Sequence, residues 1–337
     1  MAGSQPTASS AAVRLADRSV LVTGAYGFVG GWLVRALVEG GARVTVLRRS
    51  ARPGCVLTLH GTEEHVAVYD GDVVDGDCIG RAMREQRVDS VLHLAATSTV
   101  GAADSAPLQT FESNVRGTWV LLEECRRQHV RWVVVASSEH AYGPAERLPL
   151  SEGAALRPPR PYEASKAAAD IIARSYWAGY GLPVATTRFG NVYGGGDQNR
   201  SRLVPGTVAA LLDGRKPLIR SDGSPQRDFL HVRDAVAAYL ALVVALEAGA
   251  ARGEAFNAGG GEPHRVLDVV TALCQLSDTG IEPDVQGSGT PPGEIHRQWL
   301  DSSKLHALTG WQPGVDLSDG LAETLRWYRE HPLSLAS

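Results

Sequence analysis

Tyr162 and Lys166 are the residues whose types and spacing most clearly suggest chemistry. They stand four positions apart in Tyr-Glu-Ala-Ser-Lys, so on a helix both side chains lie on one face and can act as one acid/base unit. A free phenol has a pKa of about 10 and is a poor base near neutral pH, but a fixed cation such as Lys166 lowers that pKa. The pair predicts proton chemistry at an alcohol. Because the same spacing also occurs on ordinary solvated helices, the prediction depends on the rest of the chain.

A glycine-rich loop near the N-terminus predicts a dinucleotide site. The β-branched run 19–23 indicates a buried parallel strand, and it leads into Gly24-x-x-Gly27-x-x-Gly30 and a helical pattern. Gly24 permits a tight turn, Gly27 lets the backbone approach a pyrophosphate, and Gly30 lets the helix pack closely on the strand. The first N–H groups of that helix suit phosphate oxygens. The expected loop contacts are Gly24, Tyr26, Gly27, Phe28, Val29 and Gly30.

The elements that must position these residues alternate along the chain. Predicted strands lie near 19–23, 43–47, 66–69, 89–94, 131–136 and 183–188. Helical patterns lie near 28–40, 75–86, 106–128 and 162–179, and later near 202–213, 232–247, 264–276 and 317–330. This order predicts an α/β fold, a Rossmann-type doubly wound parallel sheet with a smaller interleaved substrate domain.

The predicted domain boundaries follow from the alternation of strands and helices, which becomes less regular after Asn191. We expect a disordered tail over 1–12 and a dinucleotide-binding domain over 13–190 plus about 232–257. The substrate domain would comprise about 191–231 and 258–331.

Composition narrows the class of protein. With 337 residues, 44% hydrophobic and 21% charged, the chain can bury a substantial core. A formal net charge of -4 gives no basic footprint for nucleic acid. The four cysteines lack metal-ligand spacing, so no metal site is expected and a reducing cytosol fits. Without a signal-peptide pattern or an apolar run long enough for a membrane, we predict a cytoplasmic protein.

Taken together, the loop and the Tyr162/Lys166 pair resemble the extended short-chain dehydrogenase/reductase family, in its branch of nucleotide-sugar epimerases and dehydratases. The motifs that carry the resemblance lie at 23–30, 93–96, 137–138, 141–143, 162–166, 188–191, 227–234 and 310–313. The resemblance implies an NAD(P)-dependent enzyme that transiently oxidises C4 of a nucleotide-diphosphate sugar. Relatives that only sense a dinucleotide usually lose the Tyr/Lys pair, which makes a non-catalytic role a remote alternative.

The cofactor contacts beyond the loop leave NAD and NADP both open. Family habit favours NAD, but Arg48 and Arg49 stand where NAD-preferring members usually have a carboxylate, and could pair with the 2′-phosphate of NADP. By resemblance, Asp72 and Val73 cap the adenine. Further expected contacts, at the nicotinamide and its ribose, are Leu94, Ala95, Ala96, Tyr162 and Lys166.

The resemblance also assigns the catalytic steps. Tyr162 removes the proton from the sugar 4-hydroxyl while hydride passes from C4 to the cofactor, and Ser138 holds the reacting oxygen. In 4,6-dehydratases the next two positions supply an acid for the departing C6 hydroxyl and a base for the C5 proton. Here they are Glu139 and His140, which favours dehydration. A 4-epimerase needs neither group, and it remains the alternative.

Substrate contacts are likewise implied by the family match. Thr97 and Thr99 border the sugar pocket, Asn114 shapes the site, and Asn191 adds an amide donor. Arg227 and Arg297 match positions that clamp the diphosphate, for which a forked guanidinium is well suited. Arg202 lies in a segment, 188–205, that resembles CDP-glucose 4,6-dehydratases. The family habit of pairing the helices near 106–128 and 162–179 implies a homodimer.

Overall fold

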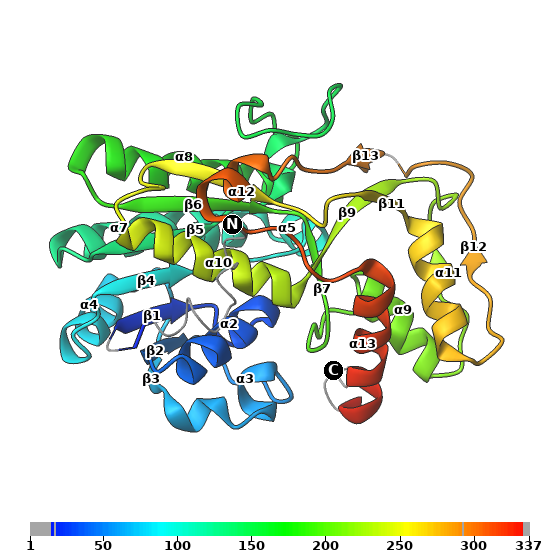
Figure 1. The fold of residues 1–337 in the computed structure, drawn as a ribbon, viewed down its shortest axis with the longest axis horizontal. Coiled ribbons are helices and arrows are strands. Elements are labelled where there is room, and N and C mark those ends of the chain that lie inside the picture. Colours follow the sequence, from blue (N-terminus) through cyan, green and yellow to red (C-terminus); the bar gives the residue numbers. More distant parts are fainter. Residues whose placement is uncertain (1–14, 17, 292, 333–337) are drawn as a thin grey trace, which may run out of the picture.

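A seven-stranded sheet forms the centre of the larger part of the chain (Figure 1). The computed structural model describes residues 15–16, 18–291 and 293–332, so the predicted tail over 1–12 lies outside the described residues. The strands are β1 (Ser19–Thr23), β2 (Arg43–Arg48), β3 (Ala67–Asp70), β4 (Ser90–His93), β5 (Trp132–Ala136), β6 (Val184–Phe189) and β10 (Glu254–Ala258). All their pairings are parallel, in the order β10-β6-β5-β4-β1-β2-β3. The predicted doubly wound sheet is confirmed.

Helices cover both faces of this sheet, each over its own apolar core. On one face lie α2 (Phe28–Glu39) and α10 (Val232–Glu247), and on the other lie α4 (Gly76–Glu85), α7 (Gly117–Arg127) and α8 (Pro161–Tyr180). Alternation along β1 serves both cores, since Val20 and Val22 belong to the first and Leu21 to the second. A strand buried on both faces is apolar throughout, which is why these strands read as continuous hydrophobic runs.

A smaller sheet lies beside the first, to the right in Figure 1. It contains β7 (Asn191–Tyr193), β9 (Gln226–His231), β11 (Pro263–Arg265) and β13 (Arg297–Gln298). Around it pack α9 (Leu203–Leu212), α11 (Val266–Ser277) and α13 (Leu317–Glu330), with a separate apolar core. A pair of short strands, β8 (Leu218–Ile219) and β12 (Asp284–Val285), lies at its far side.

Short elements complete the described chain: α3 (Val56–Leu59), η1 (Thr62–His65), α5 (Val100–Ser105), α6 (Pro107–Phe111), η2 (Glu112–Arg116), η3 (Glu139–Tyr142) and α12 (Ser303–Thr309). The helix predicted near 106–128 is thus α6, the π-helical turn η2 and α7 in succession. Although α12 belongs by sequence to the second predicted domain, it packs against β10 and α10. The domain division itself stays a prediction.

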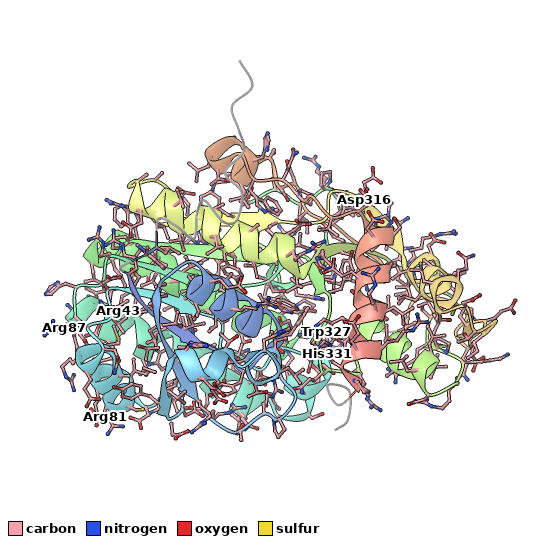
Figure 2. The ribbon with its side chains drawn as sticks, turned by 60° about the horizontal axis from the view of Figure 1, so that its bottom comes forward. Arg43, Arg81, Arg87, Asp316, Trp327 and His331 are labelled. Carbon is pink, nitrogen blue, oxygen red and sulfur yellow. The ribbon has the colours of Figure 1, made fainter. Side chains whose placement is uncertain are left out.

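The two parts meet at an aromatic contact. Trp32 on α2 donates its indole N–H to the carbonyl of Gly195, 2.8 Å away, in the segment after β7. Near the end of α13, Trp327 lies against Gly195 and stacks on His331 at 4.4 Å between ring centroids (Figure 2). A side chain at Gly195 would overlap the Trp327 ring, so this close approach requires glycine.

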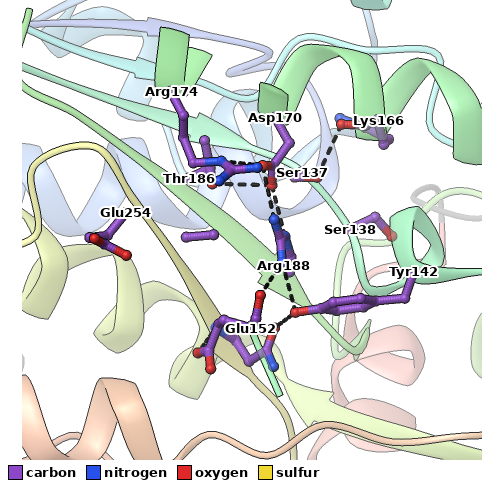
Figure 3. Close-up of polar contacts among 12 residues, drawn as sticks. Ser137, Ser138, Tyr142, Glu152, Lys166, Asp170, Arg174, Thr186, Arg188 and Glu254 are labelled. Atoms are coloured by element: carbon purple, nitrogen blue, oxygen red, sulfur yellow. Dashed lines mark hydrogen bonds and ion pairs between the residues drawn. The ribbon is translucent and has the colours of Figure 1, made fainter. Parts of the chain in front are cut away.

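A buried ion pair anchors the helix that carries Tyr162 and Lys166 (Figure 3). Arg188 on β6 binds Asp170 of α8 through both carboxylate oxygens, at 2.8 and 3.0 Å, and also donates to the Tyr142 hydroxyl at 3.0 Å. The Tyr142 hydroxyl in turn donates a hydrogen bond to Asn257 Oδ1 on β10, 2.7 Å away. Because a bidentate Arg–carboxylate pair is geometrically specific, this network sets the position of α8 on the sheet.

Candidate active site

The glycine loop lies where the strand order reverses, between the carboxyl ends of β1 and β4. Gly24 has a φ of +76°, and a Cβ there would come within 2.7 Å of the Ala95 nitrogen. A Cβ at Gly30 would overlap the carbonyl of Gly24, so both positions need glycine. Gly27 caps α2 without a side-chain hydrogen bond, which leaves the first helix N–H groups to face a ligand. A pyrophosphate fits this cradle, at the crevice where open parallel sheets bind their ligands.

Arg48 is already paired with carboxylates. Its guanidinium contacts both oxygens of Asp70, at 2.6 and 3.0 Å, and Glu63 at 3.2 Å. The hydrogen bond from Arg48 lowers the pKa of Asp70. Glu63 also accepts a short hydrogen bond from the Tyr26 hydroxyl, whose pKa is raised first by burial. Arg49 is exposed. The structure therefore does not present Arg48 as a free cation for a 2′-phosphate.

The expected adenine and nicotinamide contacts flank the loop. Asp72 accepts a hydrogen bond from the Val74 nitrogen at 3.3 Å, and Val73 is buried beneath α7. Leu94, Ala95 and Ala96 are half-buried at the end of β4. Because Ala95 and Ala96 carry only a methyl group, they leave room beside the loop, as predicted for a nicotinamide position.

His93 is enclosed between two threonines. Its ring nitrogens lie 2.7 Å from the Thr23 hydroxyl and 3.0 Å from the Thr118 hydroxyl. Burial, with a contribution from the Lys166 charge, lowers the pKa of His93 to about 3. The imidazole is therefore neutral, and it connects β1, β4 and α7 as a packed structural residue.

Tyr162 and Lys166 are buried side by side on α8. Lys166 Nζ donates to the carbonyl of Ala136 at the end of β5, 2.9 Å away, and burial lowers its pKa to about 8. Burial also raises the pKa of Tyr162, against which act a hydrogen bond with Ser138 and the positive charge of Arg202. The expectation that Lys166 sets a low pKa for the phenol is thus not met here, because desolvation outweighs the nearby charges.

Glu139 and His140 follow Ser138 on the turn η3 and lie near Tyr162. Glu139 is buried, and its Oε1 accepts a hydrogen bond from the Asn191 amide at 2.6 Å. Burial, with the negative charge of Asp228, raises the pKa of Glu139 well above its usual range, although Arg227 opposes the rise. The centroid of the His140 ring lies 6.0 Å from that of Tyr162. Both Glu139 and His140 therefore lie close to Tyr162.

The two arginines predicted to clamp a diphosphate do not lie together. Arg227 on β9 is buried and binds Glu294 at 2.9 Å, whereas Arg297 on β13 is exposed and stacks on Trp299. In the parallel pairing, Gln298 stands opposite Arg227 and Arg297 stands one residue away. Because side chains alternate between the faces of a strand, Arg297 points away from the face that carries Arg227.

Gln298 is a site residue that the sequence did not reveal. It is buried, and its amide donates to the Glu139 carbonyl at 3.0 Å, while its own oxygen has no hydrogen-bond partner among the described residues. The feature of the sequence that could have pointed to Gln298 is its position directly after Arg297, in the two-residue strand β13. A strand that short is difficult to recognise before its partner β9 is known.

Two of the remaining residues expected to contact substrate, Asn114 and Arg202, form hydrogen bonds with the loop after β4. Asn114 bridges the loop after β4 to α8, bonding the backbone of Thr97 at 2.7 and 3.0 Å and the hydroxyl of Ser165 at 2.9 Å. Arg202 pairs with Asp197 at 3.0 Å. Its other nitrogen donates to the backbone and hydroxyl oxygens of Ser98, both at 3.2 Å. Thr99 begins α5 without a side-chain capping bond.

Two features are absent from the described residues. These residues contain no helix that is both long and apolar enough to cross a membrane. Across the same residues, histidine, cysteine, aspartate and glutamate form no group of three suited to a metal ion.

Fold and site together define the class. A glycine loop at the switch point of a parallel sheet, with a buried Ser/Tyr/Lys group at the same edge, is the arrangement of a short-chain dehydrogenase/reductase. Residues 20–259 match the family described as the NAD dependent epimerase/dehydratase family. The chain belongs to that family, as an enzyme of its nucleotide-sugar branch.

Similar proteins include both kinds of enzyme. A dTDP-glucose 4,6-dehydratase from Xanthomonas campestris pv. campestris is 34% identical over 330 residues, covering 91% of this chain and 92% of that protein. The crystal structure of a dTDP-glucose 4,6-dehydratase from Streptomyces venezuelae, with NAD and TYD bound, has a TM-score of 0.83 at 32% identity and covers 93% and 97% of the two chains. A UDP-glucose 4-epimerase from Thermotoga maritima, solved with UDP-glucose, has a TM-score of 0.85 at 27% identity and covers 93% and 99%.

Proposed function

We propose that this enzyme converts a nucleoside diphosphate-glucose into its 4-keto-6-deoxy product by 4,6-dehydration. The observation that carries the proposal is the pair Glu139 and His140, two adjacent titratable side chains on η3 that lie close to the tyrosine that would take the C4 hydroxyl proton. Dehydratases named among the similar proteins act on dTDP-glucose, which is the first substrate to test.

Oxidation at C4 would use the buried group on α8 and β5. Tyr162 accepts the proton of the C4 hydroxyl, and Ser138 holds the oxygen through its hydroxyl. When bound, the nicotinamide takes the hydride from C4 and gives it back later in the cycle. Lys166 keeps a cation at the end of β5, where a nicotinamide ribose would lie. This step is common to dehydratases and epimerases.

Removal of water would use Glu139 as the acid and His140 as the base. The raised pKa of Glu139 keeps a larger fraction of this carboxyl protonated near neutral pH than in an exposed glutamate. It can therefore deliver a proton to the departing C6 hydroxyl. The imidazole of His140, which is less buried than Glu139, takes the C5 proton.

NAD is the proposed cofactor. The dehydratase structure from Streptomyces venezuelae contains NAD. In this chain Arg48 is neutralised by Asp70 and Glu63, so a 2′-phosphate would have to displace existing ion pairs. For the nucleotide diphosphate, the supporting side chain is Arg227, whose buried guanidinium faces Glu139 and Gln298. Burial lowers the pKa of Arg227 although Glu294 and Glu139 oppose the fall, and a diphosphate would add further negative charge beside this buried cation.

A homodimer in the cytoplasm completes the proposal. Large apolar side chains are exposed along α6, α7 and α8, including Leu108 at 82% and Ile171 at 53%. A second copy could cover them by helix packing. The four cysteines are free and buried, as suits a reducing compartment. Light scattering of the purified chain, before and after Ile171→Glu, tests the dimer.

The second candidate is a nucleotide-sugar 4-epimerase, favoured by the likeness to the UDP-glucose 4-epimerase of Thermotoga maritima. The deciding experiment incubates the enzyme and NAD with dTDP-, UDP- and CDP-glucose and follows product mass. Loss of one water supports dehydration. Unchanged mass with conversion to the galactose epimer refutes dehydration and establishes the epimerase.

A further inference from the structure

We infer that Glu163 is a positioning residue for His140, forming with it a carboxylate–imidazole pair that serves the removal of the C5 proton. The inference rests on the proposed dehydration. It adds a residue whose proposed role, at C5, is separate from the transfer of hydride and proton at C4.

The geometry places two buried polar groups face to face. Glu163 follows Tyr162 on α8, and its side chain is only 3% exposed. Its Oε1 lies 3.8 Å from His140 Nδ1 on η3. Among the described residues, neither His140 Nδ1 nor Glu163 Oε2 has a hydrogen-bond partner. A buried carboxylate is costly unless it is paired, so the nearby imidazole supplies a physical reason for a glutamate at this position.

The orientation of the ring follows from this contact. With the proton of the neutral imidazole on Nδ1, directed at Glu163, Nε2 carries the free lone pair. That nitrogen is then the base. When it accepts a proton, the carboxylate stabilises the imidazolium, in the manner of the third member of a catalytic triad. The ring also packs edge-on against Tyr162, the residue that would take the C4 hydroxyl proton.

The proposed step balances. After oxidation at C4, the C5–H bond breaks and its proton goes to His140 Nε2. The electron pair forms the C5=C6 bond as the C6–O bond breaks, and Glu139 protonates the departing hydroxyl to give water. Return of the hydride to C6 lets His140 give its proton back to C5. The proton that Tyr162 took from the C4 hydroxyl balances the one that Glu139 lost.

Other charged groups around His140 do not take the place of Glu163. On η3, the Glu139 carboxyl is engaged by Asn191. On α8, Tyr162 presents its ring edge-on to the imidazole. Arg202 directs its guanidinium to Asp197 and Ser98. Glu163 is thus the carboxylate whose position suits Nδ1.

The test separates oxidation from water loss in Glu163→Gln, using dTDP-glucose in deuterated water. Hydride transfer is followed by reduced-nicotinamide absorbance after rapid mixing, and water loss with C5 deuteration by mass and NMR. We expect oxidation at C4 within a few-fold of wild type. Water loss should slow about 10- to 100-fold, the range seen when the carboxylate that orients a metal-ligating histidine is removed. Glu163→Asp, which keeps a carboxylate, should recover part of the rate.

A double-variant cycle shows whether the residue acts through His140. His140→Asn should lose water release more severely than Glu163→Gln, and adding Glu163→Gln to it should cause no further loss. Additive losses, equal losses of oxidation and water release, or an unaffected Glu163→Gln enzyme would each overturn the inference while leaving dehydration in place. A wild-type enzyme that releases no water from any of the three nucleotide-sugars refutes the proposed function, and this inference with it.

Discussion

Replacing Glu139 by glutamine removes the proposed acid while preserving the shape of the side chain. Asn191 donates to Oε1, so the carboxyl proton belongs on Oε2, which has no hydrogen-bond partner among the described residues. The glutamine oxygen can accept the same bond from Asn191, and its NH₂ group then occupies the position of the O–H. Because one unpaired buried donor replaces another, the penalty of about 1–3 kcal/mol for such a group largely cancels.

The pH dependence of stability gives the variant a distinct signature. The folded-state pKa of Glu139 is raised, mainly by burial. Its stabilising contribution is therefore fully present below the unfolded pKa of about 4.3, and it is lost as the pH rises through the folded pKa. Glutamine does not titrate. Wild type and Glu139→Gln should therefore have similar free energies of unfolding in acid. Between the unfolded and the folded pKa of Glu139, the free energy of unfolding of the variant should rise relative to that of wild type by about 1.4 kcal/mol per pH unit.

The catalytic loss should be confined to water release. A positioned general acid contributes about 10²- to 10⁴-fold, so the barrier to dehydration should rise by roughly 3 to 5 kcal/mol. Oxidation at C4, followed by reduced-nicotinamide absorbance, should stay within a few-fold of wild type. Denaturant melts at several pH values measure the stability.

Two results would refute this reasoning. Water release at the wild-type rate in Glu139→Gln would show that another group protonates the leaving hydroxyl. A variant that loses stability relative to wild type as the pH rises would show that the carboxyl is ionised in the folded protein.

Three further substitutions test the rest of the site. Tyr162→Phe should slow C4 oxidation about 10²- to 10⁴-fold by removing the base, and near-normal oxidation would dismiss Tyr162 from that role. Arg227→Met should weaken calorimetric binding of dTDP about 10- to 100-fold, with Arg297→Met as the control; equal losses would place both arginines at the diphosphate. Arg202→Met removes a charge that lowers the pKa of Tyr162, so the rise of the oxidation rate with pH should move to higher pH, and an unmoved profile would contradict that coupling.

Much of the fold could be predicted because its strands are local hydrophobic signals. The strands β1, β4, β5 and β6 are buried on both faces, which leaves short, mostly apolar segments between turn residues. Strands that the sequence did not predict, such as β10 and β13, form for a different reason. β10 contains Asn257, which serves the Tyr142 network, and β13 has two residues that are held only by pairing with β9. Their strand character comes from distant partners, and no local pattern indicates it.

The site divides in the same way. Ser138, Tyr162 and Lys166 could be placed from motifs because their elements end at one sheet edge. The directions in which Arg227 and Arg297 point could not be predicted from motifs. They depend on the pairing of β9 with β13, in which alternating side chains place the two arginines on opposite faces. Likewise, the pKa of Tyr162 depends on its burial and on the charge of Arg202. Arg202 is placed by packing of the segment after β7, where it pairs with Asp197.

Our proposal of dehydration over epimerisation rests on the energetic cost of burying Glu139. Likeness of fold does not decide it, since enzymes of both kinds resemble this chain and share oxidation at C4. An epimerase has no use for an acid beside C6, yet here a carboxyl is buried, its pKa is raised and one of its oxygens is unpaired among the described residues. Such a group destabilises the folded protein near neutral pH, where an apolar side chain would not. A reaction that consumes a proton at this position supplies the reason for keeping it.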